Sequence, residues 1–529
     1  MIQSDFIEVT EVEGSLASGK CLLKFTPKTE HLRFVASGRG MGNLRATIPF
    51  GESGSSYTFL GLASDLGGLL LSTPVPLPEY ARFTISGDTV RVESPVAVKA
   101  EASKEGLAAL LLAYGERHKS PSIPAPVFGW NSWDNFNASV TEADILANMD
   151  AIEKRPWLKE KLTHIIIDDG WQTNWGEWTV NGKFPRGMDW LAKEIRRRGF
   201  TPGLWLAPLM VEPATPLYQR HSECLLKDTK GHPYLVNLGH TRTFYALDLS
   251  VKKSEAFLRE TFKRVADWGY EYLKLDFLYN QAECLENGDG FAAEKSWSTN
   301  EHVRRLLALV REVCGPKTFV VACNPLYELG GKDIQEARLT NDIASFWENA
   351  MLCLNAHAAR FFMARRWLLA DPDFTVVRVP GATWDAGPHP FHCEVAWNRN
   401  QENKGWRRGK FWTESEMKVA FVLDLLSGGS IILGDHLPQL NAQGDAYLKL
   451  ALKYGGGEPA APLDLDGRRS LPCIWKNDRL VAFLNPYETH LKLSVPAGVR
   501  LGKEIFTGEE GVASAVPLAP HSTRVYELA

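Results

Sequence analysis

The pattern of hydrophobic and polar positions changes twice along this chain of 529 residues. Residues 1–120 hold short segments in which apolar and polar side chains alternate, as in "ARFTISGDTVRVES", separated by clusters of Gly, Ser and Asp. Alternation with a period of two is typical of strands that bury one face. The pattern therefore predicts an N-terminal antiparallel β-sandwich, and the Pro- and Ser-rich residues 121–127 predict a linker after it.

From Phe128 onward, largely apolar runs alternate with amphipathic stretches. Such runs are typical of parallel strands buried on both faces, and the amphipathic stretches predict helices that cover them. This alternation predicts a (β/α)8 TIM barrel over residues 128–454. The eight strand candidates are "FGWNSWD", "HIIIDDGW", "TPGLWLAP", "FYALDLS", "YLKLDFLY", "TFVVACNP", "EARLTND" and "WLLADPDFTVV".

Residues 455–529 return to short strand-like segments such as "STRVYELA". They predict a small C-terminal antiparallel β domain. We therefore expect a multidomain α/β protein in which a central barrel lies between two β domains. The length of the chain agrees with more than one domain.

The charge balance and the apolar runs argue against two classes of partner. Lys and Arg number 59 against 63 Asp and Glu, so no polycationic face for nucleic acid is expected. No apolar run approaches the length of a membrane span, and the first residues lack the features of a signal peptide. We therefore expect a cytoplasmic protein without a nucleic-acid or membrane partner, although a chain trimmed of its leader would show the same pattern.

The cysteines and histidines predict neither disulfides nor a metal site. The 8 cysteines are scattered without CxxC spacing, which is typical of reduced thiols in a chain of this size. The 13 histidines include no HxH or HxxxH pair. The "DPD" at residues 371–373 offers oxygen ligands, but no further ligands stand at a recognisable spacing. We therefore expect no metal and no cofactor.

Acidic residues recur at the ends of the predicted barrel strands, where the catalytic residues of TIM barrels lie. A single Asp at such a place is equally well explained as a cap on the following helix. Helix caps, however, do not require the Lys, Arg and Trp residues that these strands also contain. The acids are Asp168, Asp169, Asp248, Asp276, Asp342, Asp371 and Asp373.

Lys274 and Asp276 lie two positions apart in "YLKLDF", so both side chains point to the same face of their strand. A cation there would lower the pKa of the aspartate and keep it ionised, as the nucleophile of a glycosidase must be. A structural ion pair is the alternative. Arg338 and Asp342 in "ARLTND" offer a second carboxyl, which would act as a general acid if its surroundings keep it protonated.

Five tryptophans fall at or just beyond the ends of predicted strands. Ligand pockets are commonly lined by aromatic side chains together with a few polar groups, and aromatic faces pack well against the C–H faces of sugar rings. Combined with the acids, the tryptophans favour a sugar-binding pocket, and a dry aromatic core cluster is the alternative. They are Trp130, Trp133, Trp171, Trp175 and Trp205.

Six motifs in the same order resemble the barrel of glycoside hydrolase family 36, the retaining α-galactosidases, which are related to family 27. The resemblance runs from about residue 128 to 375, and its motifs are "GWNSW", "IIDDGW", "PGLWLAP", "YALDLS", "YLKLDF" and "ARLTND". It implies a sandwich, a barrel and a small C-terminal β domain. It also implies an exo-acting enzyme that removes terminal α-linked galactose from oligosaccharides through a covalent galactosyl-enzyme intermediate.

The resemblance implies roles for individual residues. Asp276 would be the nucleophile and Asp342 the acid/base. Lys274 would bind a substrate hydroxyl beside the nucleophile, and Arg338 would contact the 2-hydroxyl side of the sugar. The axial 4-hydroxyl and the 6-hydroxyl would be held by Asp168 and Asp169, and the pocket would be lined by Trp133, Trp205 and Cys323.

This chain departs from the family pattern in three places. Several relatives carry a Trp-rich loop from the sandwich into the active site, but residues 1–129 here contain no tryptophan. Many relatives have two glutamates where this chain has "LAPLMV". A segment over residues 379–412 is expected to overhang the site, and it contains Trp384, Trp397, Trp406 and Trp412.

These departures leave the aglycone, the chain-length preference and the choice between monomer and homo-oligomer open. Two other enzymatic readings also stay open: galactosyl transfer of the raffinose or stachyose synthase type, and α-N-acetylgalactosaminidase activity. A non-catalytic sugar-binding protein is disfavoured, because Asp276, Lys274 and Asp342 are all present and a lectin does not need them.

Overall fold

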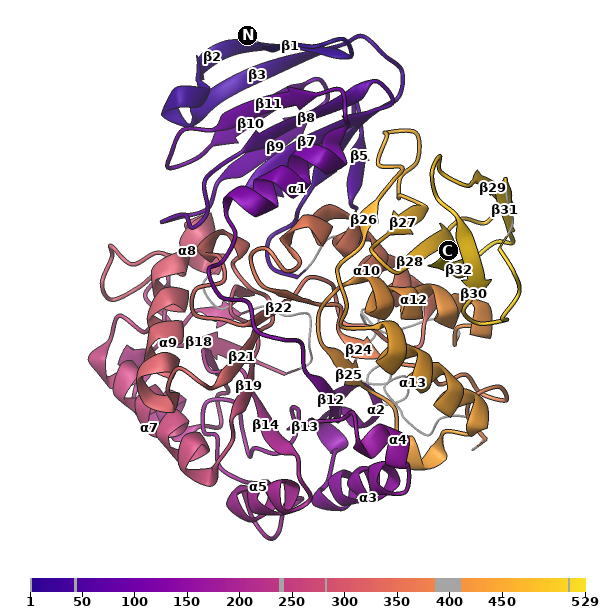
Figure 1. Ribbon diagram of the computed structural model, residues 1–529. Helices are drawn as coiled ribbons and strands as arrows, with labels where there is room; N and C mark the ends of the chain where they lie inside the picture. Colours follow the sequence, from indigo (N-terminus) through magenta and orange to yellow (C-terminus); the bar gives the residue numbers. More distant parts are fainter. Residues whose placement is uncertain (1, 42–44, 237–241, 281–282, 386–410, 512–513) are drawn as a thin grey trace.

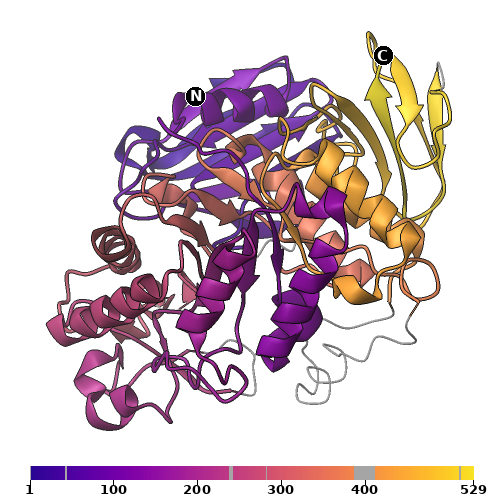
Figure 2. The ribbon, with the colours of Figure 1, turned by 60° about the horizontal axis from the view of Figure 1, so that its bottom comes forward.

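The computed structural model describes residues 2–41, 45–236, 242–280, 283–385, 411–511 and 514–529. The chain forms a TIM barrel flanked by antiparallel sheets, as the sequence predicted. Figures 1 and 2 both show the N-terminal sheets on one side of the barrel and the C-terminal sheet beside helices α12 (Glu414–Leu426) and α13 (Ala442–Tyr454). The domain boundaries drawn from the sequence pattern stay a prediction.

The N-terminal part is a sandwich of two antiparallel sheets with a separate apolar core between them. Helix α1 (Leu107–Arg117), which the alternation in residues 1–120 did not predict, packs on the second sheet. Gly61 and Gly68 of that sheet leave room for Leu107, because a Cβ on either glycine would overlap it.

The first sheet contains, in spatial order, β1 (Ile2–Gln3), β2 (Ile7–Ser15), β3 (Lys20–Pro27), β10 (Thr89–Glu93), β9 (Arg82–Ser86) and β6 (Ser53–Tyr57). The second contains β11 (Lys99–Ser103), β8 (Gly67–Ser72), β7 (Phe59–Ser64), β4 (Leu32–Ala36) and β5 (Thr47–Pro49).

The barrel is built from parallel strand segments whose side chains are almost all buried, which explains their continuous apolar runs. In spatial order they are β23 (Leu369–Asp371), β22 (Glu336–Arg338), β21 (Phe319–Ala322), β19 (Tyr272–Leu275), β14 (Thr201–Leu206), β13 (His164–Ile167), β12 (Phe128–Asn131), β25 (Ile431–Leu433) and β24 (Phe374–Thr375).

The barrel closes through a strand that is split in two. β23 pairs with β22, and β24 pairs with β25, yet only Pro372 and Asp373 separate β23 from β24 in the chain. Proline has no N–H to donate to a ladder, and Asp373 has a φ of 84°, so the extended backbone breaks at these two residues. The two halves count as one strand, and the nine parallel segments of the described chain therefore make a closed barrel of eight strands.

One of the eight predicted barrel strands is wrong. "FYALDLS" forms β18 (Phe244–Ala246), which pairs antiparallel with β15 (Met210–Val211) and β17 (Leu235–Val236) outside the barrel. Its central Tyr245 is only partly buried, so the segment has one covered face, unlike a central barrel strand. The eighth barrel strand is β25, a run of three buried residues that follows the sequence Ser-Gly-Gly-Ser and was too short to stand out in the sequence.

Helices connect most of the barrel strands and cover the outside of the barrel (Figure 1). No regular helix is described between β21 and β22, where residues 323–335 contain only the 3-10 turn Tyr327–Leu329. The helices are α2 (Trp133–Phe136), α3 (Glu142–Glu153), α4 (Pro156–Lys159), α5 (Met188–Arg197), α6 (Pro216–Arg220), α7 (Lys252–Trp268), α8 (Glu283–Asn287), α9 (Thr299–Cys314) and α10 (Trp347–Arg360), followed by α12 and α13.

The C-terminal part is an antiparallel sheet that packs against α12 through β32 (Ser522–Leu528). Its other strands are β26 (Ala461–Pro462), β27 (Ile474–Lys476), β28 (Leu480–Asn485) and β30 (Leu501–Glu504), beside the pair β29 (Leu491–Ser494) and β31 (Ala515–Leu518). A further short pair joins β16 (Lys227–Asp228) to β20 (Gly290–Phe291). Among the helices of the described chain, none has the length and apolar character needed to cross a bilayer.

Candidate active site

The parallel direction of the barrel strands brings the predicted site residues to one mouth of the barrel. Lys274 lies on β19, Trp205 on β14 and Arg338 at the end of β22. The remaining six follow the ends of strands: Trp133 after β12, Asp168 and Asp169 after β13, Asp276 after β19, Cys323 after β21, and Asp342 after β22. This is the face on which TIM barrels carry their active sites.

Asp276 is held as a fixed hydrogen-bond acceptor at the end of β19. The indole N–H of Trp205 donates to its Oδ2 at 3.0 Å, and the backbone N–H of Phe277 donates to its Oδ1 at 2.7 Å. Phe277 reaches this position with a φ of 56°, an unusual value for a bulky residue. Two donors on two oxygens leave the carboxyl little freedom to rotate.

The pKa of Asp276 shifts in the direction opposite to the sequence prediction. Burial raises the pKa of Asp276 to about 6, the positive charge of Lys274 lowers it, and the negative charge of Asp342 raises it. The lysine acts in the predicted direction, but desolvation is the larger effect, so the pKa ends above its ordinary value. At neutral pH the carboxyl is still mostly ionised.

Lys274 pairs directly with Asp168 rather than with Asp276. Its Nζ lies 2.8 Å from Asp168 Oδ2, and both side chains are buried. The side-chain amide of Asn131 donates to the same oxygen at 2.9 Å, while the backbone N–H of Asp169 donates to Oδ1 at 2.9 Å. These contacts fix the lysine ammonium and the Asp168 carboxylate as one buried unit.

Asp169 has a different set of partners, which the sequence analysis missed. Its Oδ1 accepts hydrogen bonds from Gln172 and, at 3.0 Å, from the indole N–H of Trp175. Arg242 Nη1 lies 3.7 Å from its Oδ2, too far for a direct hydrogen bond. The arginine also contacts Glu212 Oε1 at 2.9 Å and lies over the ring of Trp175, 4.8 Å from its centroid.

Burial raises the pKa of Asp169, and the nearby charge of Arg242 lowers it. Gln172 and Arg242 belong to loops, and no spacing in the sequence connects them with the "IIDD" motif. The sequence offered one signal for Arg242: it lies six residues before Asp248, which belongs to the motif "YALDLS".

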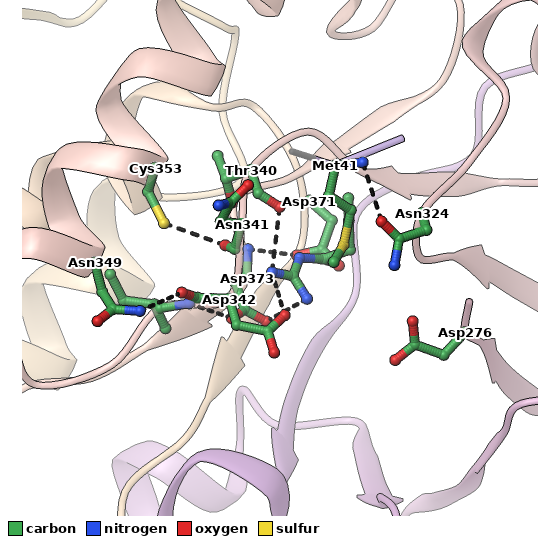
Figure 3. A network of polar contacts seen from close by, with 12 residues as sticks. Met41, Asp276, Asn324, Thr340, Asn341, Asp342, Asn349, Cys353, Asp371 and Asp373 are labelled. Atoms are coloured by element: carbon green, nitrogen blue, oxygen red, sulfur yellow. Dashed lines mark hydrogen bonds and ion pairs between the residues drawn. The ribbon is translucent and has the colours of Figure 1, made fainter. Parts of the chain in front are cut away.

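Arg338 is the centre of an ionic network at the end of β22, and its acidic partners Asp342, Asp371 and Asp373 are labelled in Figure 3. Its Nη2 lies 3.1 Å from Asp342 Oδ1, its Nη1 lies 2.9 Å from Asp373 Oδ1, and its Nε lies 3.9 Å from Asp371 Oδ2. The hydroxyl of Tyr327 donates to the Arg338 carbonyl at 2.6 Å. Three carboxyls therefore share one guanidinium.

The carboxyls of Asp276 and Asp342 point toward one another in Figure 3. The two groups also interact electrostatically, because the negative charge of Asp342 raises the pKa of Asp276. The Asp342 side chain is 25% exposed, whereas Asp371 and Asp373 are buried. Among the acids around Arg338, Asp342 is thus the one that a ligand in the barrel mouth can reach.

The remaining predicted pocket residues differ in how much surface they offer. Trp133 is partly exposed, and Cys323 is buried with a pKa raised well above its ordinary value by desolvation. Trp130 and Trp171 are fully buried, and their indole N–H groups donate to the carbonyls of Asp435 and Trp205. Those two belong to the core and present no face to a sugar.

The Trp-rich segment is described only at its ends. Trp384 and Trp412 are buried, and the indole N–H of Trp412 donates to the Arg378 carbonyl at 3.0 Å. Trp397 and Trp406, and with them the expected overhang, lie outside the described residues. Within the described part of the chain, no group of three or more His, Cys, Asp or Glu side chains is arranged to hold a metal ion.

Comparisons with known proteins identify similar barrels. A model of the Melibiase family matches residues 123–311, which include five of the six motifs but not "ARLTND". The chain is 27% identical to "A type blood alpha-D-galactosamine galactosaminidase" of Flavonifractor plautii over 37% of this chain and 18% of that protein. It is 25% identical to "Probable alpha-galactosidase A" of Aspergillus terreus over 52% of this chain and 49% of that protein. The chain thus spans less than half the length of these curated relatives.

Solved structures of α-galactosidases and related enzymes share the fold. An α-galactosidase from Thermus thermophilus, solved with stachyose, has a TM-score of 0.63 at 22% identity, covering 84% of this chain and 96% of that one. The family 36 α-galactosidase AgaA of Geobacillus stearothermophilus has 0.56 at 12% identity, covering 99% and 75%. A family 27 β-L-arabinopyranosidase of the same organism has 0.53 at 16% identity, covering 77% and 96%.

These findings support a similarity to the Melibiase family and to α-galactosidases. The match to the Melibiase family favours a relationship to glycoside hydrolase family 27, which is itself related to family 36. The narrower placement in family 36 stays a prediction.

Proposed function

We propose that the protein is a retaining α-galactosidase that hydrolyses terminal α-linked galactose through a covalent galactosyl-enzyme intermediate. The observation that carries this proposal is the pair of carboxyls at the barrel mouth. Asp276 is fixed by two N–H donors, while Asp342 is partly exposed and points toward it beside Arg338. The similarity of residues 123–311 to the Melibiase family supports the same activity.

The two carboxyls divide the chemistry between them. Asp276, ionised, attacks the anomeric carbon and forms an ester while the glycosidic bond breaks. Asp342 gives its proton to the departing oxygen, because a sugar alkoxide is a poor leaving group. Asp342, now ionised, then takes a proton from water as this water attacks the anomeric carbon, and the bond between that carbon and the Asp276 oxygen breaks, which restores both residues and releases galactose. Asp371 and Asp373 are less suited to this role than Asp342, because they are buried and occupied by backbone and arginine contacts.

The buried pairs beside Asp276 supply recognition of the sugar. The ion pair of Asp168 and Lys274 offers charged groups to one hydroxyl of the sugar. Asp169 offers its Oδ2 to a second hydroxyl, because Arg242 faces this oxygen without a direct hydrogen bond. We assign the 4- and 6-hydroxyls of galactose to these two aspartates. A site built to hydrogen-bond hydroxyls discriminates strongly against a sugar that misplaces one, because its buried polar groups are then left unpaired.

The test combines a nucleophile variant with product analysis. The enzyme should release galactose from melibiose, raffinose and an aryl α-galactoside, and the α-anomer should appear first. Asp276→Ala should lose this activity and keep its fold, and added azide should restore turnover of an activated aryl galactoside with β-galactosyl azide as product. Unaided turnover by Asp276→Ala would contradict the assignment. Release of β-galactose would contradict retention, and transfer to a second sugar in place of water would indicate a transferase.

A further inference from the structure

The strand break between β23 and β24 places a strained aspartate under the proposed acid/base. Asp373 adopts a φ of 84°, a region that L-residues other than glycine, asparagine and aspartate rarely enter. Its side chain is only 1% exposed. Such a conformation is unfavourable and persists only where the surroundings hold it. The contacts of residues 371–373 indicate what this conformation is used for.

Asp342 lies beyond the end of its strand, where no ladder of hydrogen bonds holds the backbone. The turn at residues 371–373 takes over that task. The N–H of Leu339 donates to the Asp371 carbonyl at 3.0 Å, and the hydroxyl of Thr340 donates to the Pro372 carbonyl at 2.9 Å.

The Asp373 carboxyl completes this support from the other side of Asp342. Its Oδ2 accepts the N–H of Ile343, the residue after Asp342, at 2.7 Å. Its Oδ1 lies 2.9 Å from Arg338 Nη1, while Arg338 Nη2 contacts Asp342 Oδ1 at 3.1 Å. One carboxyl therefore touches both the backbone that carries Asp342 and the guanidinium that orients it. The N–H of Asp373 itself donates to Asp371 Oδ1 at 2.7 Å, which closes the turn.

We propose that Asp373 is a positioning residue that sets where the carboxyl of Asp342 lies relative to the departing glycosidic oxygen. This rests on the proposed function of Asp342 as the acid/base. A pair that served only to neutralise Arg338 would not need the hydrogen bond to Ile343, and that bond fixes the backbone directly behind Asp342. Loss of Asp373 should therefore impair proton donation more than it impairs binding of the sugar.

Two variants separate the contacts of Asp373. Asp373→Gly suits the left-handed backbone and removes the carboxyl, so it loses both contacts without adding strain. Asp373→Asn also tolerates this backbone, and its amide oxygen can still accept the N–H of Ile343, but its charge for Arg338 is gone. The substrates are melibiose, whose leaving group must be protonated, and a dinitrophenyl α-galactoside, whose leaving group departs unaided.

For Asp373→Gly we expect kcat/KM on melibiose to fall by roughly 10²-fold or more, as for loss of general acid catalysis, and on the dinitrophenyl substrate by far less. The inhibition constant of galactose should stay unchanged. Asp373→Asn should recover part of the loss on melibiose. Asp248→Asn is the matched control, because Asp248 is also buried and accepts a backbone N–H, from Ala293 at 2.6 Å, away from the site. Any loss in that variant should be equal for the two substrates.

Equal losses on both substrates in Asp373→Gly, or weaker galactose binding in step with the loss of rate, would overturn the inference. A wild-type enzyme that turns over neither substrate would instead overturn the proposed function. The positioning role is then tested alone by crystal structures of wild type and Asp373→Gly. In the variant, the Asp342 carboxyl should be displaced from its wild-type position, and the N–H of Ile343 should have lost its acceptor at residue 373. An Asp342 carboxyl that occupies the same position in both structures would contradict the role.

Discussion

Asp276 carries a pKa that burial raises to about 6, and this value sets the acid limit of the proposed reaction. The nucleophile must be ionised, so kcat/KM should fall as the pH drops through about 6. A dinitrophenyl α-galactoside is the right substrate for the measurement, because its leaving group needs no acid and only the nucleophile limits the rate. An acid limb near pH 4 would contradict the raised pKa.

Trp205→Phe provides a matched change at the same carboxyl. The indole N–H stabilises the ionised form, so its removal should raise the pKa of Asp276 further. We expect the acid limb of the variant to move up by about 1 pH unit, since a hydrogen bond to a charged group contributes roughly 1.5 kcal/mol and one pKa unit corresponds to about 1.4 kcal/mol. A limb that stays in place, or moves to lower pH, would show that the hydrogen bond does not control this carboxyl.

Asp342→Ala tests the proposed acid/base that faces Asp276. Activity on melibiose should be almost abolished, while the first step on a dinitrophenyl α-galactoside should keep much of its rate. Because Asp342 must also activate water, a burst of phenolate should precede a slow steady state, which stopped-flow absorbance detects. If both substrates slow by the same factor without a burst, Asp342 binds the sugar and does not transfer the proton.

The residues of the candidate site could be named from the sequence, but their pairing could not. Strand alternation placed Lys274 and Asp276 on one face, and both do lie at the barrel mouth. The lysine nevertheless pairs with Asp168, because β13 and β19 are alternate strands on either side of β14 and the inward-facing side chains of alternate strands meet inside a closed barrel. Arg242 and Gln172 come from loops whose course depends on the whole fold, so no local pattern could assign them to Asp169.

At the scale of elements, long amphipathic and apolar segments were predictable and short ones were not. Strands such as β13 and β14 follow from uninterrupted apolar runs. β25 has only three residues, and what identifies it is its pairing with β12 and β24 rather than its composition. β18 has a similar apolar content but one partly open face, and its antiparallel partners were not visible in the sequence.

The turn into β25 depends on close packing at Gly429. A Cβ at this position would overlap the Ala370 carbonyl oxygen and would lie 3.2 Å from Glu336 Oε1. Glu336 accepts hydrogen bonds from the Ser430 N–H and hydroxyl at 2.8 and 2.7 Å, so the turn has no room to shift. Gly429→Ala should therefore destabilise the barrel by more than about 2 kcal/mol, seen as a lower midpoint in thermal unfolding.

Gly182→Ala is the control for this substitution. A Cβ at Gly182 would meet no atom within 4 Å, and the backbone there is not left-handed. This variant should unfold within about 0.5 kcal/mol of wild type, as is usual for a surface change that meets no neighbour. Equal behaviour of the two glycine variants would show that the turn at Gly429 can relax.

At the scale of the whole molecule, Arg360 joins the sandwich to the barrel close to the site. It is fully buried at the end of α10, and its guanidinium donates to Ser37 Oγ at 3.0 Å and to the Gly38 and Met41 carbonyls at 3.0 and 2.7 Å. It also donates to the Leu339 carbonyl at 2.8 Å, three residues before Asp342. The N-terminal sheets are thereby tied to the segment that carries the proposed acid.

Arg360→Met keeps much of the length of the side chain but leaves these buried acceptors without the guanidinium. Each acceptor costs about 1–3 kcal/mol when it loses its donor, so the loss of stability should exceed about 3 kcal/mol. We also expect a lower kcat/KM on melibiose in the fraction that stays folded. Calorimetry and initial rates measure the two effects, and Arg468→Met, which removes an exposed arginine near Asp65, should change neither.

The pairing of β12 with β25 constrains when the barrel can fold during synthesis of the chain. Residues 128–131 lie beside residues 431–433, so the barrel cannot close until some 300 further residues have left the ribosome. At a synthesis rate of about 5–20 residues per second, the first barrel strand waits on the order of 15–60 seconds for its last neighbour. The sandwich strands are complete by Ser103 and can fold during that time. For that interval the nascent barrel exposes unpaired parallel edges, so the yield of folded protein should depend on how quickly translation delivers the final strand.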